Sequence, residues 1–73
     1  MAQTLTFELD REFIALNDLL KLAGIADSGG AGKAMVANGD VSVDGQLESR
    51  KTAKIRAGQV VTLPGIILKV VAA

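Results

Sequence analysis

The chain has 73 residues, of which 49% are hydrophobic and 22% charged, and its acidic and basic residues balance to a net charge of zero. It has no cysteine and no histidine, which excludes disulfides, thiolate nucleophiles, imidazole bases and zinc sites of the usual ligand types. This composition predicts one compact domain over residues 1–73, with no cofactor and no metal.

The first half of the chain carries one strand pattern and two helix patterns. Residues 4–9 alternate polar and apolar side chains, as a half-buried strand does. A helical spacing of apolar residues follows over residues 16–23, and Gly24 is placed to end that helix. Ser28 is a good N-cap for a second helix of about ten residues, which Gly39 would close.

The second half of the chain changes to the period of two that is typical of strands. Residues 41–48 predict a hairpin, because the central Asp44-Gly45 pair favours a type I′ turn. Residues 50–57 are poor in large apolar side chains and predict a surface loop. Two further strands, separated by a turn, are predicted over residues 59–63 and 66–71. The order of elements is that of an α+β domain.

Charge is distributed unevenly along the chain. The residues that precede Lys21 carry a net charge of minus three, from Glu8, Asp10, Arg11, Glu12 and Asp18. The segment 50–56 has four basic residues and no acid: Arg50, Lys51, Lys54 and Arg56. Basic side chains on one loop can reach successive RNA phosphates, and arginine can bind a phosphate through two bonds. The same pattern is equally consistent with an ordinary solvated loop.

The glycine cluster over residues 28–33 has two interpretations. It is not the phosphate-binding loop of nucleoside triphosphatases, because Asp27 and Ala34 stand where that motif needs glycine and Ser or Thr. The backbone N–H groups after Ser28 could bind an RNA phosphate at the positive end of a helix. They could equally form only a helix cap. Gly32 inside the helix costs about 1 kcal/mol relative to alanine, which predicts close packing against the first helix.

Catalysis and single-strand binding both lack the residues they need. The eight carboxylates occupy positions typical of surface residues, caps or turns, and a chain this short can hardly form a cleft for an acid–base pair. Phe7 and Phe13 are the only aromatic residues, whereas modules that grip single strands use several stacking platforms. We therefore expect no enzyme and no small-molecule substrate, and an RNA partner would be a folded RNA.

The order of residues from Leu16 to Leu63 resembles the RNA-binding domain named after the fourth small-subunit ribosomal protein, the αL motif. The stretches that carry the resemblance are Leu19–Ile25, Ser28–Gly30, Lys33, Gly39–Gly45 and Gly58–Val61. The region 48–59 is most similar to small stand-alone bacterial proteins of the YbcJ type. The resemblance implies two short helices packed on a small, curved, mostly antiparallel sheet, and a protein that binds structured RNA.

The resemblance also implies which residues contact RNA, on the face formed by the two helices with the following hairpin and loop. Carried over by position, these are Lys21, Ser28, Gly29, Lys33, Arg50, Lys51 and Lys54. Arg56 is added on its charge alone.

Several positions depart from the ribosomal members of the family. Ala15 and Asn17 stand where those members usually have a basic residue and an aspartate. Asp44 and Gln46 replace the usual asparagine and a basic residue, and Gly32 replaces the usual alanine. These changes predict modest or partner-assisted RNA affinity. We also expect basic residues of the segment 50–54 to pair with Glu48 or Asp44 when RNA is absent.

The functional hypothesis is an RNA-binding adaptor that recognises ribosomal or transfer RNA, or acts during ribosome assembly. The alternative is a protein-interaction module that keeps the fold with little RNA affinity, as the zero net charge would allow. No apolar run is long enough to span a membrane, and the first residues do not resemble a signal peptide. The absence of cysteine fits a reducing compartment, so we expect a cytoplasmic protein.

Overall fold

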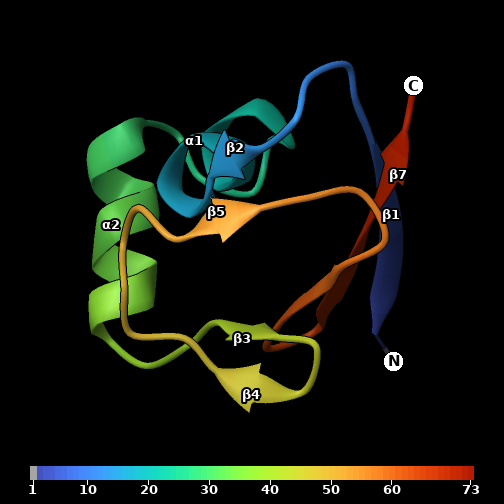
Figure 1. The fold of residues 1–73 in the computed structure, drawn as a ribbon. Coiled ribbons are helices and arrows are strands. Elements are labelled where there is room, and N and C mark those ends of the chain that lie inside the picture. Colours follow the sequence, from blue (N-terminus) through green and yellow to red (C-terminus); the bar gives the residue numbers. More distant parts are fainter. Residues whose placement is uncertain (1) are drawn as a thin grey trace.

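The computed structural model describes residues 2–73, which form two helices and two sheets (Figure 1). The helices are α1 (Leu16–Leu22) and α2 (Gly29–Ala37). The strands, in chain order, are β1 (Gln3–Leu9), β2 (Ile14–Ala15), β3 (Ser42–Val43), β4 (Gln46–Leu47), β5 (Lys54–Ile55), β6 (Val60–Leu63) and β7 (Ile66–Ala72).

The larger sheet has the strand order β1-β7-β6-β3-β4. β1 and β7 run parallel, and the other three strand pairs are antiparallel. The last strand, β7, lies between β1 and β6, so both of its edges are paired within this chain. The predicted α+β class, with two helices on a mostly antiparallel sheet, is confirmed.

One face of the larger sheet packs against the helices. Leu68 of β7 pairs with Leu5 of β1 and with Val61 of β6, which places the three side chains on the same face. The core combines this row with apolar side chains of both helices, and its fully buried members are Leu16, Leu19, Leu20, Val36, Val41, Ile55, Val61, Leu68 and Val70. In the described chain, neither helix is long and apolar enough to cross a membrane.

Both helices begin and end within a residue or two of where the sequence predicts. Gly24 follows α1 with a φ of +78°, a left-handed conformation that glycine adopts at little cost. Ser28 caps α2, because its Oγ accepts a hydrogen bond of 3.1 Å from the N–H of Ala31. At the start of α1 the N-cap residue is Ala15, whose side chain cannot accept a hydrogen bond. The bonds that replace a side-chain cap come from the segment after β4 and are described below.

Gly32 brings the two helices into backbone contact. A Cβ at this position would lie 2.7 Å from the carbonyl oxygen of Asn17 on α1, closer than real Cβ atoms come to any neighbour. The predicted role of Gly32 in close helix packing is confirmed.

The hairpin of β3 and β4 has the predicted type I′ turn. Asp44 and Gly45 have φ values of +51° and +83°, the two positive values that this turn requires. The Asp44 carboxylate also bonds to β6: its Oδ1 accepts from the N–H of Val60 at 2.9 Å, and its Oδ2 accepts from Gln59 Nε2 at 3.2 Å. The turn is therefore tied to the sheet by a side chain as well as by the backbone.

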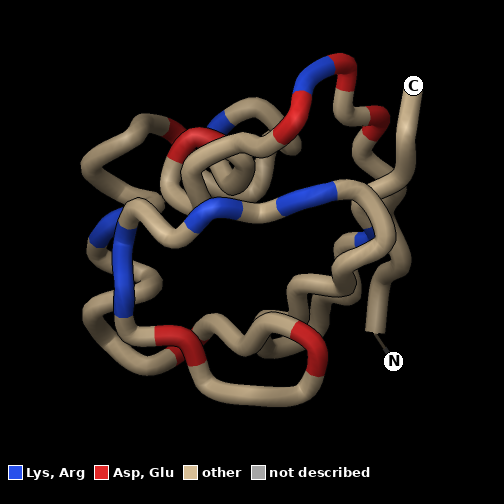
Figure 2. Tube along the Cα trace, in the orientation of Figure 1, with Lys and Arg blue, Asp and Glu red and all other residues tan. Residues whose placement is uncertain are grey.

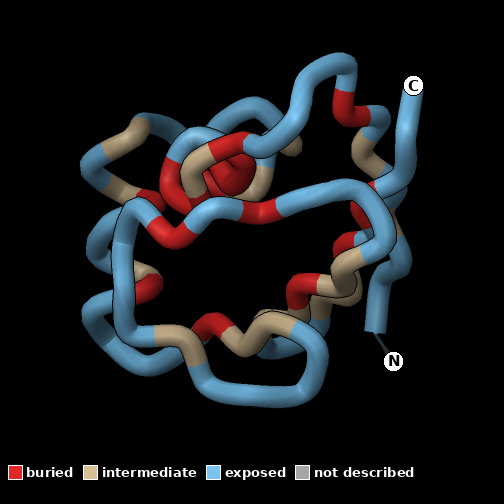
Figure 3. The backbone as a smooth tube through the Cα atoms, in the orientation of Figure 1, coloured by how far each residue is buried: buried red, intermediate tan, exposed pale blue. Residues whose placement is uncertain are grey.

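The prediction of a surface loop over residues 50–57 is wrong for its second half. Lys54 and Ile55 form β5, which pairs antiparallel with β2 in a small second sheet. Ala53 is 6% exposed and Ile55 is 1% exposed, so buried and exposed residues alternate here (Figure 3). The alternation is too short to be recognised as a strand in the sequence, and the two-residue β2 escaped prediction for the same reason.

Candidate nucleic-acid interface

The basic segment, defined as Arg50–Arg56, is held against the start of α1 by its own backbone. The N–H of Leu16 donates to the carbonyl of Ala53 at 2.9 Å, and the N–H of Asn17 donates to the carbonyl of Lys51 at 3.1 Å. These two N–H groups belong to the first turn of α1, which has no partners within its own helix. The basic segment thus caps α1, and the same two hydrogen bonds hold the segment in a defined position.

The four basic side chains of the basic segment point outward. Ala53 and Ile55 face the core, and the residues that carry the charges are all exposed: Arg50, Lys51, Lys54 and Arg56. Figure 2 shows only basic charged residues along the basic segment itself, between the acidic Glu48 that follows β4 and the start of β6. The fold therefore presents the cluster as an ordered, outward-facing row.

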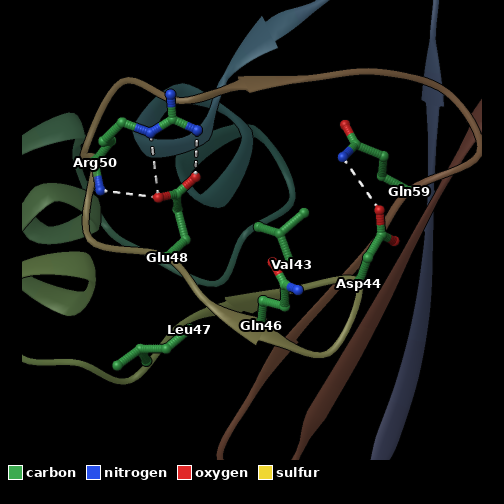
Figure 4. Close-up of a pocket in the computed structure, with 7 residues that line it drawn as sticks. All are labelled: Val43, Asp44, Gln46, Leu47, Glu48, Arg50 and Gln59. Atoms are coloured by element: carbon green, nitrogen blue, oxygen red, sulfur yellow. Dashed lines mark hydrogen bonds and ion pairs between the residues drawn. The ribbon is translucent and has the colours of Figure 1, made fainter.

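Arg50 is paired with Glu48 (Figure 4). Its Nη2 donates to Oε1 at 3.0 Å, and its backbone N–H donates to Oε2 at 3.1 Å. The hydrogen bonds from Arg50 lower the pKa of the Glu48 carboxyl below its ordinary value of 4.5, and the same contact raises the pKa of Arg50. The predicted pairing with Glu48 is confirmed. The alternative pairing with Asp44 does not form, because Asp44 is used by β6.

Arg56 is paired with Glu12, at 3.1 Å between Nη1 and Oε1. It also lies over the ring of Phe13, with 5.7 Å between its Cζ and the ring centroid, and Nζ of Lys54 lies 4.8 Å from the same centroid. Within residues 2–73, no ion pair involves Lys51 or Lys54. Two of the four cations are therefore neutralised by an acid in the free protein and two are not.

The start of α2 lies beside the start of α1, which places it near the basic segment. A Cβ added at Gly29 would lie 3.6 Å from Nδ2 of Asn17, and Asn17 is bonded through its backbone to Lys51. The Ser28 Oγ is used by the helix cap, whereas the N–H groups of Gly29 and Gly30 have no intrahelical partner at this helix end. The positive end of α2 therefore adds to the field of the basic segment.

Asn17 of α1 contacts both α2 and the basic segment. It is 7% exposed, and its carbonyl oxygen contacts the position of Gly32. Its side-chain Oδ1 is buried and has no hydrogen-bond partner among the described residues. Lys33 is one helical turn beyond Gly29, and Lys21 is one turn beyond Asn17. The structure thus brings Gly29 and Lys51 to opposite sides of Asn17, whereas no described contact links Lys21 to the basic segment.

Two shallow hollows adjoin the basic segment. One of about 460 Å³ is lined by Arg50, Thr52, Ala53 and Lys54. The other, of about 310 Å³, lies between the hairpin and the basic segment and includes Asp44, Glu48, Arg50 and Gln59 (Figure 4). Both carboxylates of the second hollow already accept hydrogen bonds, so they do not form a free acid–base pair.

A family model described as the S4 domain matches residues 7–71, nearly the whole chain. The chain belongs to the S4 domain family. The resemblance to the αL motif found in the sequence is thereby confirmed.

Similar proteins agree with this membership of the S4 domain family. YbcJ of Escherichia coli (strain K12) is 47% identical over 68 residues, which cover 92% of this chain and 97% of YbcJ. The probable ribosome maturation protein RlbA of Bacillus subtilis (strain 168) is 35% identical over 57 residues, covering 78% of this chain and 80% of RlbA. The solution structure of E. coli YbcJ, described as an αL motif involved in RNA binding, superposes with a TM-score of 0.66 at 43% identity, covering 94% and 86% of the two chains.

Sequence reasoning missed two residues of this surface. Asn17 was noted only as a departure from the family, yet it connects both helices to the basic segment. Phe13 was counted among the few aromatic residues, without a place on the surface. No pattern in the sequence points to either role, because both depend on chain segments about 35 to 45 residues away coming into contact.

Proposed function

We propose that this chain binds structured RNA, ribosomal or transfer RNA, by contacts to phosphates. The observation that carries the proposal is the anchoring of the basic segment. Two backbone hydrogen bonds to α1 and the β2–β5 pairing hold four exposed cations in one place, beside the positive end of α2. A loop without these bonds would not hold its cations in one place.

The relatives support the proposal at the level of their names. YbcJ is described by its αL motif involved in RNA binding, and RlbA is named for ribosome maturation. A role of this chain in ribosome assembly is part of our proposal.

Different residues would contact different phosphates of the RNA. Lys51, Lys54 and Lys33 would contact phosphates directly, and the N–H groups of Gly29 and Gly30 would bind another phosphate oxygen. Arg50 would first have to leave Glu48, so part of its binding free energy would be used to open that pair. Affinity would therefore be modest, and recognition would rely on the shape and backbone of the RNA.

Fluorescence anisotropy with a labelled RNA hairpin, over a range of salt concentrations, tests the proposal. With about four phosphates neutralised, log affinity should fall against log salt with a slope of about −3. A variant that changes Arg50, Lys51 and Lys54 to alanine should bind more weakly and flatten the slope by about two.

A matched control distinguishes an effect of the basic segment from the effect of losing any one positive charge. Lys51→Ala and Lys69→Ala each remove one exposed lysine, but Lys69 is on β7, outside the proposed surface. Only Lys51→Ala should reduce affinity and slope. An affinity that does not depend on salt, or equal losses in the two variants, would contradict the proposal.

The pairing of Arg50 with Glu48 and of Arg56 with Glu12 favours a second candidate function, a protein-interaction module with little RNA affinity. Exchanging Arg50 and Lys51 for glutamate distinguishes the two. An RNA surface should lose binding, whereas a mostly apolar protein interface should tolerate the change better.

A further inference from the structure

We propose that Phe13 is a stacking platform for one unpaired nucleobase of the bound RNA, with Lys54 and Arg56 holding the phosphates beside it. This inference rests on the proposed function and adds a feature of the ligand: a folded RNA with an unpaired base next to a helix. The observation behind it is that two cations lie over the exposed ring of Phe13.

Phe13 has no evident structural task. It is 37% exposed, and it belongs neither to the buried core nor to the partly buried residues packed against that core. The other aromatic residue, Phe7, does pack against the core. A large apolar side chain that stands on the surface beside cations is a candidate contact for a ligand with both an aromatic face and negative charge.

The β2–β5 pairing explains why the three side chains share one face. Ile14 pairs with Ile55, and both are buried. Because side chains alternate along strands, the residues on either side of this pair point outward: Phe13 beside Arg56, and Ala15 beside Lys54. Ala15, opposite Lys54 in this pairing, has only a methyl group on this face.

The cations over the ring do not prevent a base from stacking. Lys54 and Arg56 are exposed and attached through flexible side chains. A cation–π contact at an exposed site changes an equilibrium constant by about two- to fivefold. Stacking of a base on an aromatic ring changes the binding constant of the RNA by about five- to 150-fold. A base can therefore displace the cations from the ring. Lys54 is then close enough to contact a neighbouring phosphate, and Arg56 can do the same once it leaves Glu12.

The number of platforms limits the ligand. Proteins that bind an extended single strand of RNA use several aromatic rings in succession, and this chain has no tyrosine or tryptophan. One ring can hold one base. The ligand class is therefore a hairpin or internal loop in which a single base is unstacked beside a paired stem.

Three hairpins of the same stem test this inference, measured by anisotropy with the full chain. One carries a bulged adenine, one an abasic site in its place, and one is fully paired. The wild type should bind the bulged adenine about tenfold more tightly than the abasic hairpin. Phe13→Leu should lose this preference, and Phe13→Tyr should keep it. With 2-aminopurine at the bulge, binding should quench the emission in the wild type but not in Phe13→Leu.

The control is Val71→Ala, because Val71 is 38% exposed and lies on β7. It should leave the preference for the bulged base unchanged. If Phe13→Leu weakens all three hairpins equally, or none, the stacking inference is overturned while the proposed RNA binding stands. If the wild type binds none of the hairpins at low salt, the proposed function fails and this inference fails with it.

Discussion

Single residues set the geometry of this small domain where the chain comes closest to itself. At Gly32 the missing side chain allows α2 to approach the backbone of α1 at Asn17, and Asn17 in turn bonds to Lys51. The start of α1 at Asn17 therefore contacts both α2 and the basic segment. Helix propensity alone would favour alanine at position 32, so packing and propensity oppose one another.

Gly32→Ala should lower the free energy of unfolding by about 1 kcal/mol. The overpacking cost of about 1–3 kcal/mol exceeds the gain of about 1 kcal/mol in helix propensity, because the added Cβ would meet backbone atoms that cannot rotate away. Urea unfolding followed by circular dichroism measures the change. Gly30→Ala is the control: its Cβ would meet only the Ser28 side chain at 3.8 Å, so this variant should be at least as stable as the wild type. A Gly32→Ala variant that gains stability would contradict the packing argument.

At the scale of elements, the short β2–β5 sheet connects the core to the proposed interface. Ile55 is buried between two exposed cations, and its neighbour in the pair is the buried Ile14. One strand of two residues therefore both fills the core and orders the basic side chains. The same element places Phe13 beside Arg56, so the interface depends on its register.

Ile55→Ala should destabilise the domain by about 3 kcal/mol, because it removes a side chain that is 1% exposed and leaves a cavity. A domain of this size has about 4–11 kcal/mol of stability, so the variant should still fold at low temperature. Its RNA affinity should fall although no charge is lost. The control is Leu47→Ala, which changes a side chain that is 67% exposed and should cost less than about 0.5 kcal/mol. Equal stability of the two variants would show that β5 is not part of the core.

At the scale of the whole molecule, zero net charge conceals an uneven distribution. The basic segment has four cations, and nearby acids from other segments, Glu12 and Glu48, neutralise two of them. Long-range attraction to RNA should therefore be weak, and most of the binding free energy should come from contacts made after encounter.

The stability of the molecule should depend on pH through Glu48. Its pKa is lower in the folded state than the ordinary value of 4.5, chiefly because of the hydrogen bonds from Arg50. Its contribution to stability is therefore complete above the ordinary pKa and is lost as the pH falls through the lowered value. Urea unfolding at pH 7 and at acidic pH should show this loss in the wild type and a smaller one in Glu48→Gln. Glu8→Gln, at an exposed position on β1, should keep the wild-type loss; an unchanged profile in Glu48→Gln would contradict the assignment.

Local patterns in the sequence were sufficient for the elements whose cause is local. The cap at Ser28, the end of α1 at Gly24 and the type I′ turn at Asp44-Gly45 each depend on the conformational preference of one or two residues. The seven-residue strands β1 and β7 were also predicted, β1 from its polar–apolar alternation and β7 from its apolar run after the Pro64-Gly65 turn. The family was identified from the order and spacing of residues along the chain, which resemble the αL motif.

The fold class, most of the elements, the charge-rich segment and the family could be predicted without coordinates, because they follow from short-range preferences and from the order of residues. The three-dimensional structure was needed to show that the basic segment is anchored through Ala53 and Lys51 to α1, that Glu12 neutralises Arg56, and that Phe13 lies under two cations. It also showed that Arg50 pairs with Glu48 and not with Asp44, the two acids between which the sequence left the choice open. Most of these contacts join residues far apart in the chain. Their formation depends on how the helices and strands pack, and that packing cannot be derived from the preferences of any one segment.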